Sequence, residues 1–296
     1  MKFFNRFVFA LASIGFSVSS FATDSRGYNM APVGTNVIDS QYSVITTKQT
    51  TASGLTGKQT QETLYVRDTY FFGLGGNLAA AYVYLPYSKQ ELNITKPVTL
   101  NKQSDGMGDA KVLFAYGLYN MPALSRDEFK AFDKNGWHAA CSLAVTLPTG
   151  SYDKTTTLNS GANRYTYKPE CAAYWTKDSL QVDFFLGNTV YGDNKEYSGN
   201  KKLSQKDLLN FETRVSYNLT KDFWASADMI YYKGGETSIN GVGQKDQQEN
   251  VNAGVTLAYR VAPTQWVKLI YQKTVSGKEN SPQMKDGVGI TYQLAF

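Results

Sequence analysis

The sequence predicts an all-β protein, a transmembrane antiparallel up-and-down β-barrel of about 12 strands, and three observations support this prediction. The 296 residues are 42% hydrophobic and 14% aromatic, which excludes a disordered chain because so much apolar material can form a folded core. After the N-terminal region, no apolar run reaches the roughly 20 residues that a transmembrane helix needs. Segments of about ten residues alternate between apolar and polar or small side chains, as membrane-spanning strands do.

Residues 1–22 have the pattern of a secretory signal peptide. Lys2 and Arg6 form a basic start, and residues 7–16 are almost entirely apolar. In Ser20-Phe21-Ala22, small residues stand at the two positions that a signal peptidase reads. The apolar run is too short for a permanent membrane helix. We therefore expect the chain to be exported from the cytoplasm.

Residues 23–36 precede the first expected strand and form a separate N-terminal segment, whereas residues 37–296 are expected to form the barrel. The segment contains Pro32 and Gly34. It is either periplasmic or lumenal, and a disordered or surface-lying tail is the favoured interpretation, because chain ends are seldom tied down.

Alternation assigns the two faces of each strand. In the last segment, Val288, Ile290 and Tyr292 alternate with Gly289 and Thr291. The segments are longer than the strands of soluble sandwiches, and tyrosine and tryptophan lie near their ends, so we expect the apolar face to contact lipid. Twelve such segments, an even number as in bacterial barrels, are expected at residues 37–47, 63–72, 78–87, 109–118, 137–147, 165–175, 180–191, 208–217, 223–232, 251–261, 267–275 and 288–296.

The connections alternate in length, which predicts short periplasmic turns, long extracellular loops and two periplasmic termini. Residues 119–136 are the exception, a long periplasmic connection in which Ser125 and Glu128 form a capping-box pattern for a short helix; a solvated turn is the favoured interpretation. Short connections are expected at residues 73–77, 176–179, 218–222 and 262–266, and long ones at 48–61, 88–108, 148–164, 192–207, 233–250 and 276–284.

Charged residues of both signs fall on the parity opposite the apolar face. Three acid–base pairs lie two residues apart and therefore on one face of a strand: Asp109/Lys111, Lys168/Glu170 and Glu212/Arg214. These charges either line a narrow polar path for a solute, with weak ion selectivity, or neutralise one another and fill the interior. The candidate lumen-lining residues are Arg67, Asp109, Lys111, Arg164, Lys168, Glu170, Asp183, Glu212, Arg214, Asp228, Arg260 and Lys268, with Asp39 on the same face.

Three outward residues test the strand register. Cys141 and Cys171 lie on the apolar parity of two strands that form one hairpin, so they are expected opposite each other, either as a cross-strand disulfide or as two free thiols. Asp68 also falls on the apolar parity, which predicts a bulge nearby or a position close to the membrane rim.

Five stretches resemble the outer-membrane family named for the meta-pathway of phenol degradation. They are Gly-Met-Gly-Asp at residues 106–109, Leu-Pro-Thr-Gly-Ser-Tyr-Asp at 147–153, Asn-Arg-Tyr-Thr-Tyr-Lys-Pro-Glu at 163–170, Tyr-Gly-Asp-Asn at 191–194 and Gly-Gly-Glu-Thr-Ser-Ile-Asn-Gly at 234–241. The resemblance implies a bacterial outer-membrane barrel, often encoded with aromatic catabolism, that admits hydrophobic or aromatic compounds. It transfers no catalytic residues.

Passive passage or uptake of small solutes, among them aromatic or hydrophobic compounds, is the leading functional hypothesis. The alternative is a closed barrel that acts as a surface receptor, an adhesin or a structural outer-membrane protein. The expected partners are outer-membrane lipid, a small solute and the barrel-assembly machinery, which would bind the C-terminal strand ending in Phe296. The net charge of +5 is not concentrated in a basic block, so no nucleic-acid partner is expected.

An enzyme is disfavoured. A lipid-active barrel enzyme needs a histidine beside a serine on the lipid face, but His138 is expected to point inward and its neighbour at that spacing is Ala140. One histidine and two cysteines also argue against most Cys/His metal sites, so no metal and no cofactor are expected.

Overall fold

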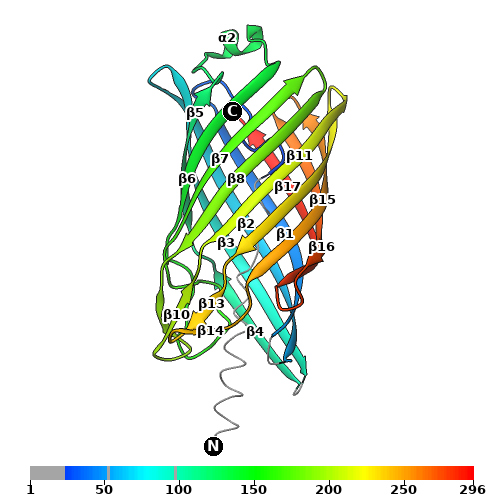
Figure 1. The fold of residues 1–296 in the computed structure, drawn as a ribbon. Helices are drawn as coiled ribbons and strands as arrows, with labels where there is room; N and C mark the ends of the chain where they lie inside the picture. The colour runs from blue at the N-terminus through cyan, green and yellow to red at the C-terminus, as the bar shows by residue number, and fades with distance from the viewer. Residues whose placement is uncertain (1–23, 52–53, 97–98) are drawn as a thin grey trace, which may run out of the picture.

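A computed structural model describes residues 24–51, 54–96 and 99–296; the expected signal peptide lies outside these ranges. Antiparallel strands form a closed barrel (Figure 1), because β1 pairs with the last strand on one side and with β2 on the other. The twelve wall strands are β1 (Asn36–Thr50), β2 (Thr56–Leu74), β3 (Asn77–Lys96), β5 (Lys111–Tyr119), β6 (Gly136–Thr146), β7 (Thr166–Lys177), β8 (Leu180–Tyr191), β11 (Leu208–Thr220), β12 (Phe223–Gly234), β15 (Gln248–Ala262), β16 (Gln265–Gly277) and β17 (Gln283–Ala295). The predicted fold class is confirmed.

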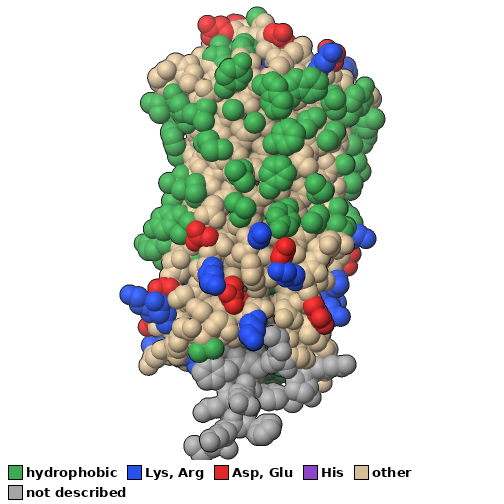
Figure 2. Space-filling view, in the orientation of Figure 1, with side chains coloured by type: hydrophobic (Ala, Val, Ile, Leu, Met, Phe, Trp, Pro, Cys, Tyr) green, Lys and Arg blue, Asp and Glu red, His purple; other side chains and the backbone are tan. Residues whose placement is uncertain are grey.

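The alternating side chains divide lipid from lumen. Ile290 of β17 is 47% exposed, whereas the adjacent Thr291 is 0% exposed. Figure 2 shows the result on one face: a broad hydrophobic band, with a belt of charged side chains toward the extracellular loops. An apolar band that is not covered by protein matches a hydrocarbon environment. Asp68 is exposed on this outer face, and the β1–β2 and β2–β3 registers are regular around it. Of the two alternatives for Asp68, the bulge is therefore wrong, and the position close to the membrane rim stays a prediction.

Several expected extracellular loops are in fact strands. β2 and β3 are 19 and 20 residues long, and β4 (Leu100–Met107) pairs with the outer part of β3. The expected loops at residues 48–61 and 88–108 are therefore largely a projecting β-structure. Both β4 and β5 pair with β3, so they are two parts of one wall position, separated by residues 108–110. Polar side chains on both faces hide this extension from a search for apolar alternation.

A second, four-stranded sheet lies in the extracellular loops. It is formed by β9 (Asn194–Tyr197), β10 (Lys201–Gln205), β13 (Thr237–Ile239) and β14 (Val242–Gly243). Tyr197, Leu203 and Ile239 form its small hydrophobic core. The expected loops at residues 192–207 and 233–250 thus fold together, although each strand is too short to show a clear period.

The long periplasmic connection contains the helix α2 (Arg126–Ala131). The Ser125 backbone N donates to Glu128 Oε2 at 2.8 Å, and the Glu128 backbone N donates to Ser125 Oγ at 3.4 Å. This reciprocal capping box satisfies the first free amides of the helix, so the favoured solvated turn is wrong. Within the described ranges, no helix is long and apolar enough to cross a membrane.

Candidate transport lumen

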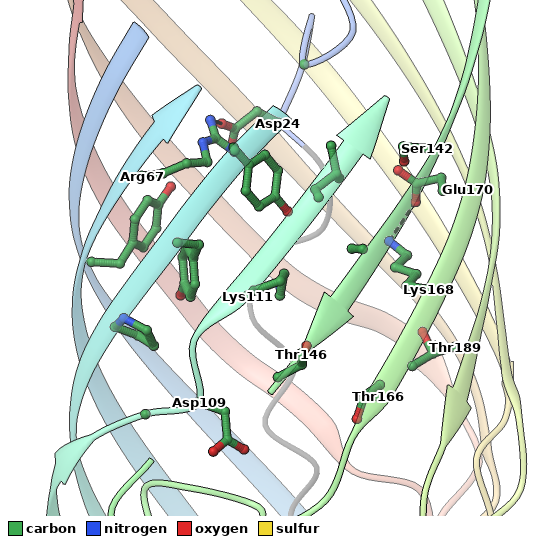
Figure 3. A pocket seen from close by; sticks show the side chains of 18 of the residues that line it. Asp24, Arg67, Asp109, Lys111, Ser142, Thr146, Thr166, Lys168, Glu170 and Thr189 are labelled. Carbon is green, nitrogen blue, oxygen red and sulfur yellow. Dashed lines mark hydrogen bonds and ion pairs between the residues drawn. The ribbon is translucent and has the colours of Figure 1, made fainter. Parts of the chain in front are cut away.

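The barrel encloses a cavity of about 860 Å³. Its walls are the inward side chains of the strands, together with the N-terminal segment and extracellular loop residues such as Tyr152 and Tyr197. Figure 3 shows charged and hydroxyl side chains from several strands converging on this space. A volume of this size holds a small organic molecule with room to spare.

The N-terminal segment lies inside the lumen and is held by hydrogen bonds to the wall. Ser25 Oγ donates to Asp228 Oδ1 at 2.9 Å, and Arg26 Nε donates to Ser216 Oγ at 2.8 Å. The Arg26 guanidinium also lies 4.5 Å from the ring centroid of Trp224. These contacts reach β11 and β12, near their periplasmic ends.

The same segment also contacts β8, β7 and β6, which follow β11 around the wall. The hydroxyls of Tyr28 and Ser142 are 2.6 Å apart, and Tyr28 also donates to Glu170 at 3.2 Å. Gln181 Nε2 donates to Asn29 Oδ1 at 2.7 Å. The segment therefore spans the periplasmic half of the lumen, in contrast to the surface-lying tail favoured from the sequence.

Arg214 lies between two carboxylates in the barrel interior. Its Nη2 is 2.8 Å from Glu212 Oε2, and its Nη1 is 3.1 Å from Asp228 Oδ2. The three side chains are at most 1% exposed. Glu212 and Arg214 follow one another on β11, as the sequence predicts, whereas Asp228 comes from β12 and faces Arg214 across the strand pair.

Three more of the predicted lumenal cations form ion pairs. Arg67 Nη2 is 2.6 Å from Asp39 and 3.1 Å from Asp24 of the N-terminal segment. Lys168 Nζ is 2.6 Å from Glu170, the second pair expected from the sequence. Arg260 pairs with Asp222 in a periplasmic turn. Asp183 and Lys268 are also buried on the inner face.

Asp109 and Lys111 both line the cavity, but among the described residues they form no ion pair with each other. Both Asp109 oxygens accept backbone amides instead, from Gly150 and Ala162 at 2.8 Å each. The two loop glycines pack tightly here, since a Cβ on Gly150 would lie 2.7 Å from Gly161. Asp109 therefore anchors the following extracellular loop, and the Lys111 ammonium lies 5.1 Å from the Tyr84 ring centroid.

Arg164 precedes β7 and lines the extracellular side of the cavity. Only 8% of the residue is exposed; its Nη2 donates to Gln205 and its guanidinium lies 4.7 Å from the Tyr191 ring centroid. Its Nη1 has no hydrogen-bond partner among the described residues.

Several of these residues are paired in register from one strand to the next, and together they form a row across the wall, which we call the register row. Every residue of the row lines the cavity. Because barrel strands tilt, the row runs obliquely toward the extracellular end of β8. Its members are Asp39, Arg67, Tyr84, Lys111, Thr146, Thr166 and Tyr191.

The cysteines and the histidine lie away from the cavity. Cys141 and Cys171 are opposite each other on β6 and β7 and form a disulfide on the outer face. His138 is buried, its ring stacks on Tyr174 at 4.6 Å, and its Nδ1 lies 2.7 Å from the backbone carbonyl of Asn120. Within the described part of the chain, no three His, Cys, Asp or Glu side chains form a potential metal site.

Sequence reasoning missed the lumenal partners that alternation does not reveal. Asp24, Ser25 and Tyr28 lie before the first strand, and Asp222 lies in a turn. The mixture of charge, hydroxyl and aromatic groups in residues 24–29 is the only local signal, and it does not specify a location.

Comparisons with known proteins agree with this architecture. Residues 39–292 match the family model described as "Putative MetA-pathway of phenol degradation", so the chain belongs to this family. A crystal structure of an outer membrane channel from Pseudomonas putida F1 is similar, with a TM-score of 0.80 and 19% identity, over 93% of this chain and 100% of that one. No curated protein is significantly similar to the chain.

Two autotransporter barrels share the general fold at lower similarity. The β domain of a Bordetella autotransporter has a TM-score of 0.53 and 8% identity, over 88% of this chain and 98% of that one. The transport unit of an Escherichia coli autotransporter has a TM-score of 0.50 and 8% identity, over 99% and 97%. The chain is an outer-membrane β-barrel of the phenol meta-pathway family.

Proposed function

We propose that this member of the phenol meta-pathway family is a channel for passive passage of small solutes, including aromatic or hydrophobic compounds, across the outer membrane. The observation that carries the proposal is the 860 Å³ cavity, which reaches from the extracellular loops to the N-terminal segment. Ion pairs along its wall leave part of the interior open, so the charges do not simply fill the barrel. The family description and the similar Pseudomonas channel support this function.

The N-terminal segment, residues 24–30, is the proposed constriction on the periplasmic side. Ser25, Arg26, Tyr28 and Asn29 make polar contacts with the wall, and such contacts exchange readily with water when a segment moves. Tyr28 and Met30 also pack against a buried hydrophobic cluster that contains Leu78 and Tyr174, which holds the segment more firmly. A closed barrel that acts as a receptor or adhesin is the second candidate, because this same segment narrows the lumen.

Conductance distinguishes the two candidates. The mature protein and a variant lacking residues 24–30 are inserted into planar bilayers, and both are first checked for heat-modifiable gel migration. A channel predicts measurable single-channel conductance that increases in the truncated variant. Conductance indistinguishable from bare lipid in both proteins, with no solute uptake into liposomes, would contradict passage and favour the closed barrel.

We also propose that the barrel-assembly machinery recognises the C-terminal strand, which ends in Phe296. The Phe296 backbone exchanges two hydrogen bonds of 3.0 Å with Asn36, so this end becomes fully paired only when the barrel closes. Deletion of Phe296 is expected to reduce the amount of heat-modifiable protein in outer membranes, while refolding in detergent continues.

A further inference from the structure

The Lys111 ammonium group faces the cavity without an acidic partner. Arg67, Lys168 and Arg214 each form an ion pair inside the barrel, whereas Lys111 forms none among residues 24–51, 54–96 and 99–296. Its Nζ lies 5.1 Å from the centroid of the Tyr84 ring. A cation in a confined interior is stabilised by an anion or by polar groups, so Lys111 is available to an anionic solute.

The nearby acids are engaged by other groups. Asp109 accepts two backbone amides of the extracellular loop. Glu170 pairs with Lys168 and accepts from Tyr28 and Asn210. Neither carboxylate is therefore in direct contact with the Lys111 ammonium group, and its charge is not balanced by an adjacent acid.

Hydroxyl and aromatic groups flank Lys111 in the register row. Lys111 lies opposite Tyr84 on one side and Thr146 on the other, and Thr146 lies opposite Thr166. Figure 3 shows Lys111, Thr146 and Thr166 on neighbouring strands beside the cavity. The Tyr84 ring also packs on Tyr65, with centroids 4.7 Å apart, which provides an aromatic wall next to the ammonium group.

A second cationic group lies farther toward the extracellular end of the cavity. Arg164 Nη1 has no hydrogen-bond partner in the described chain, although the residue is 92% buried, and its guanidinium lies over the Tyr191 ring. Tyr191 is opposite Thr166, so the row that contains Lys111 ends beside Arg164. An anion entering from outside would meet Arg164 first and Lys111 next.

We propose that Lys111, Tyr84 and the adjacent threonines form a binding subsite for aromatic carboxylates. The carboxylate accepts hydrogen bonds from the ammonium group and the threonine hydroxyls, and the aromatic ring packs against the tyrosines. This inference deepens the proposed channel function and rests on it, since it names the class of solute that the lumen prefers.

Binding of three matched probes to the folded protein in detergent tests the subsite by titration calorimetry. Benzoate has both the ring and the charge, benzamide is its neutral analogue, and cyclohexanecarboxylate has the charge without the aromatic ring. We expect benzoate to bind about tenfold more tightly than benzamide, the difference that one charge-assisted hydrogen bond provides. Cyclohexanecarboxylate is expected to lie between the two.

Three variants test whether Lys111 causes the preference for benzoate over benzamide. Lys111→Met should abolish the preference for benzoate over benzamide. Lys111→Arg, which keeps the positive charge, should retain this preference. Lys268→Met is the matched control, because it makes the same replacement at a buried lysine that lines the same cavity from β16. Equal affinity of wild type for benzoate and benzamide, an unchanged preference in Lys111→Met, or an equal loss of preference in Lys268→Met would each overturn the proposal.

The experiments distinguish failure of the proposed channel function from failure of the proposed binding subsite. If benzoate binds through Lys111 but bilayer conductance is absent, the subsite stands as a binding site and the channel proposal fails. If conductance is present and the probes do not discriminate, the channel stands and the subsite fails. If Lys111→Met does not fold, Lys111→Gln, which also removes the charge, takes its place in the same comparison of the three probes.

Discussion

Replacement of Arg214 by methionine should destabilise the barrel more than any other single loss of charge in the lumen. Arg214 balances Glu212 and Asp228, and all three side chains are at most 1% exposed. Methionine keeps much of the side-chain volume while removing the guanidinium, so the change isolates the charge. Two carboxylates then remain buried without their cation.

The structure indicates how large the loss of stability should be and how it divides between Glu212 and Asp228. Breaking a buried ion pair from one side costs roughly 3 to 5 kcal/mol, and a polar lumen that admits water favours the lower value. Within the described chain, Glu212 keeps one side-chain hydrogen-bond donor, the amide of Asn210 at 2.9 Å. Asp228 keeps three hydroxyl donors, namely Ser25, Ser226 and Thr256. Glu212 should therefore account for more of the loss.

Urea unfolding in phospholipid bilayers, followed by tryptophan fluorescence, measures the free energy of unfolding. We expect Arg214→Met to lower it by about 3 kcal/mol. Adding Glu212→Gln to that variant should recover more stability than adding Asp228→Asn. A loss below about 0.5 kcal/mol, the usual size of a surface substitution, or greater recovery with Asp228→Asn would refute the reasoning.

Three further predictions concern the loops and the outer face. Asp109→Ala removes the acceptor of two loop amides, so protease cleavage of residues 148–164 should become about tenfold faster; unchanged cleavage would contradict its anchoring role. Loss of the disulfide in Cys141→Ser should lower unfolding free energy by about 3 kcal/mol, as its cysteines are 30 residues apart, and dithiothreitol should reproduce the loss in wild type only. Leu257→Lys places a charge on the exposed apolar face and should cost about 2 to 4 kcal/mol in bilayers, whereas Leu257→Ile should have little effect; equal unfolding energies for both variants would argue against lipid contact there.

The sequence by itself determined the twelve strands of the barrel wall and their two faces, but not the strands formed by the extracellular loops. A period of two is a local property, because successive side chains of a strand point to opposite sides whatever the partner strand is. The alternation of Ile290 with Thr291 therefore identified the lipid and lumen faces correctly. The same rule predicted the pairs Lys168/Glu170 and Glu212/Arg214, whose members are neighbours on one strand face.

Only the tertiary structure decided which distant groups meet. Asp228 reaches Arg214 through the register of two strands, and Asp24 reaches Arg67 because the N-terminal segment enters a lumen that exists only after closure. Asp109 lies two residues from Lys111, yet it binds loop amides, since a folded loop brings fixed donors to its carboxylate. Such partners depend on barrel closure, strand register and loop packing. These features are set by contacts between residues that are far apart in the chain, and such contacts produce no periodic pattern in the sequence.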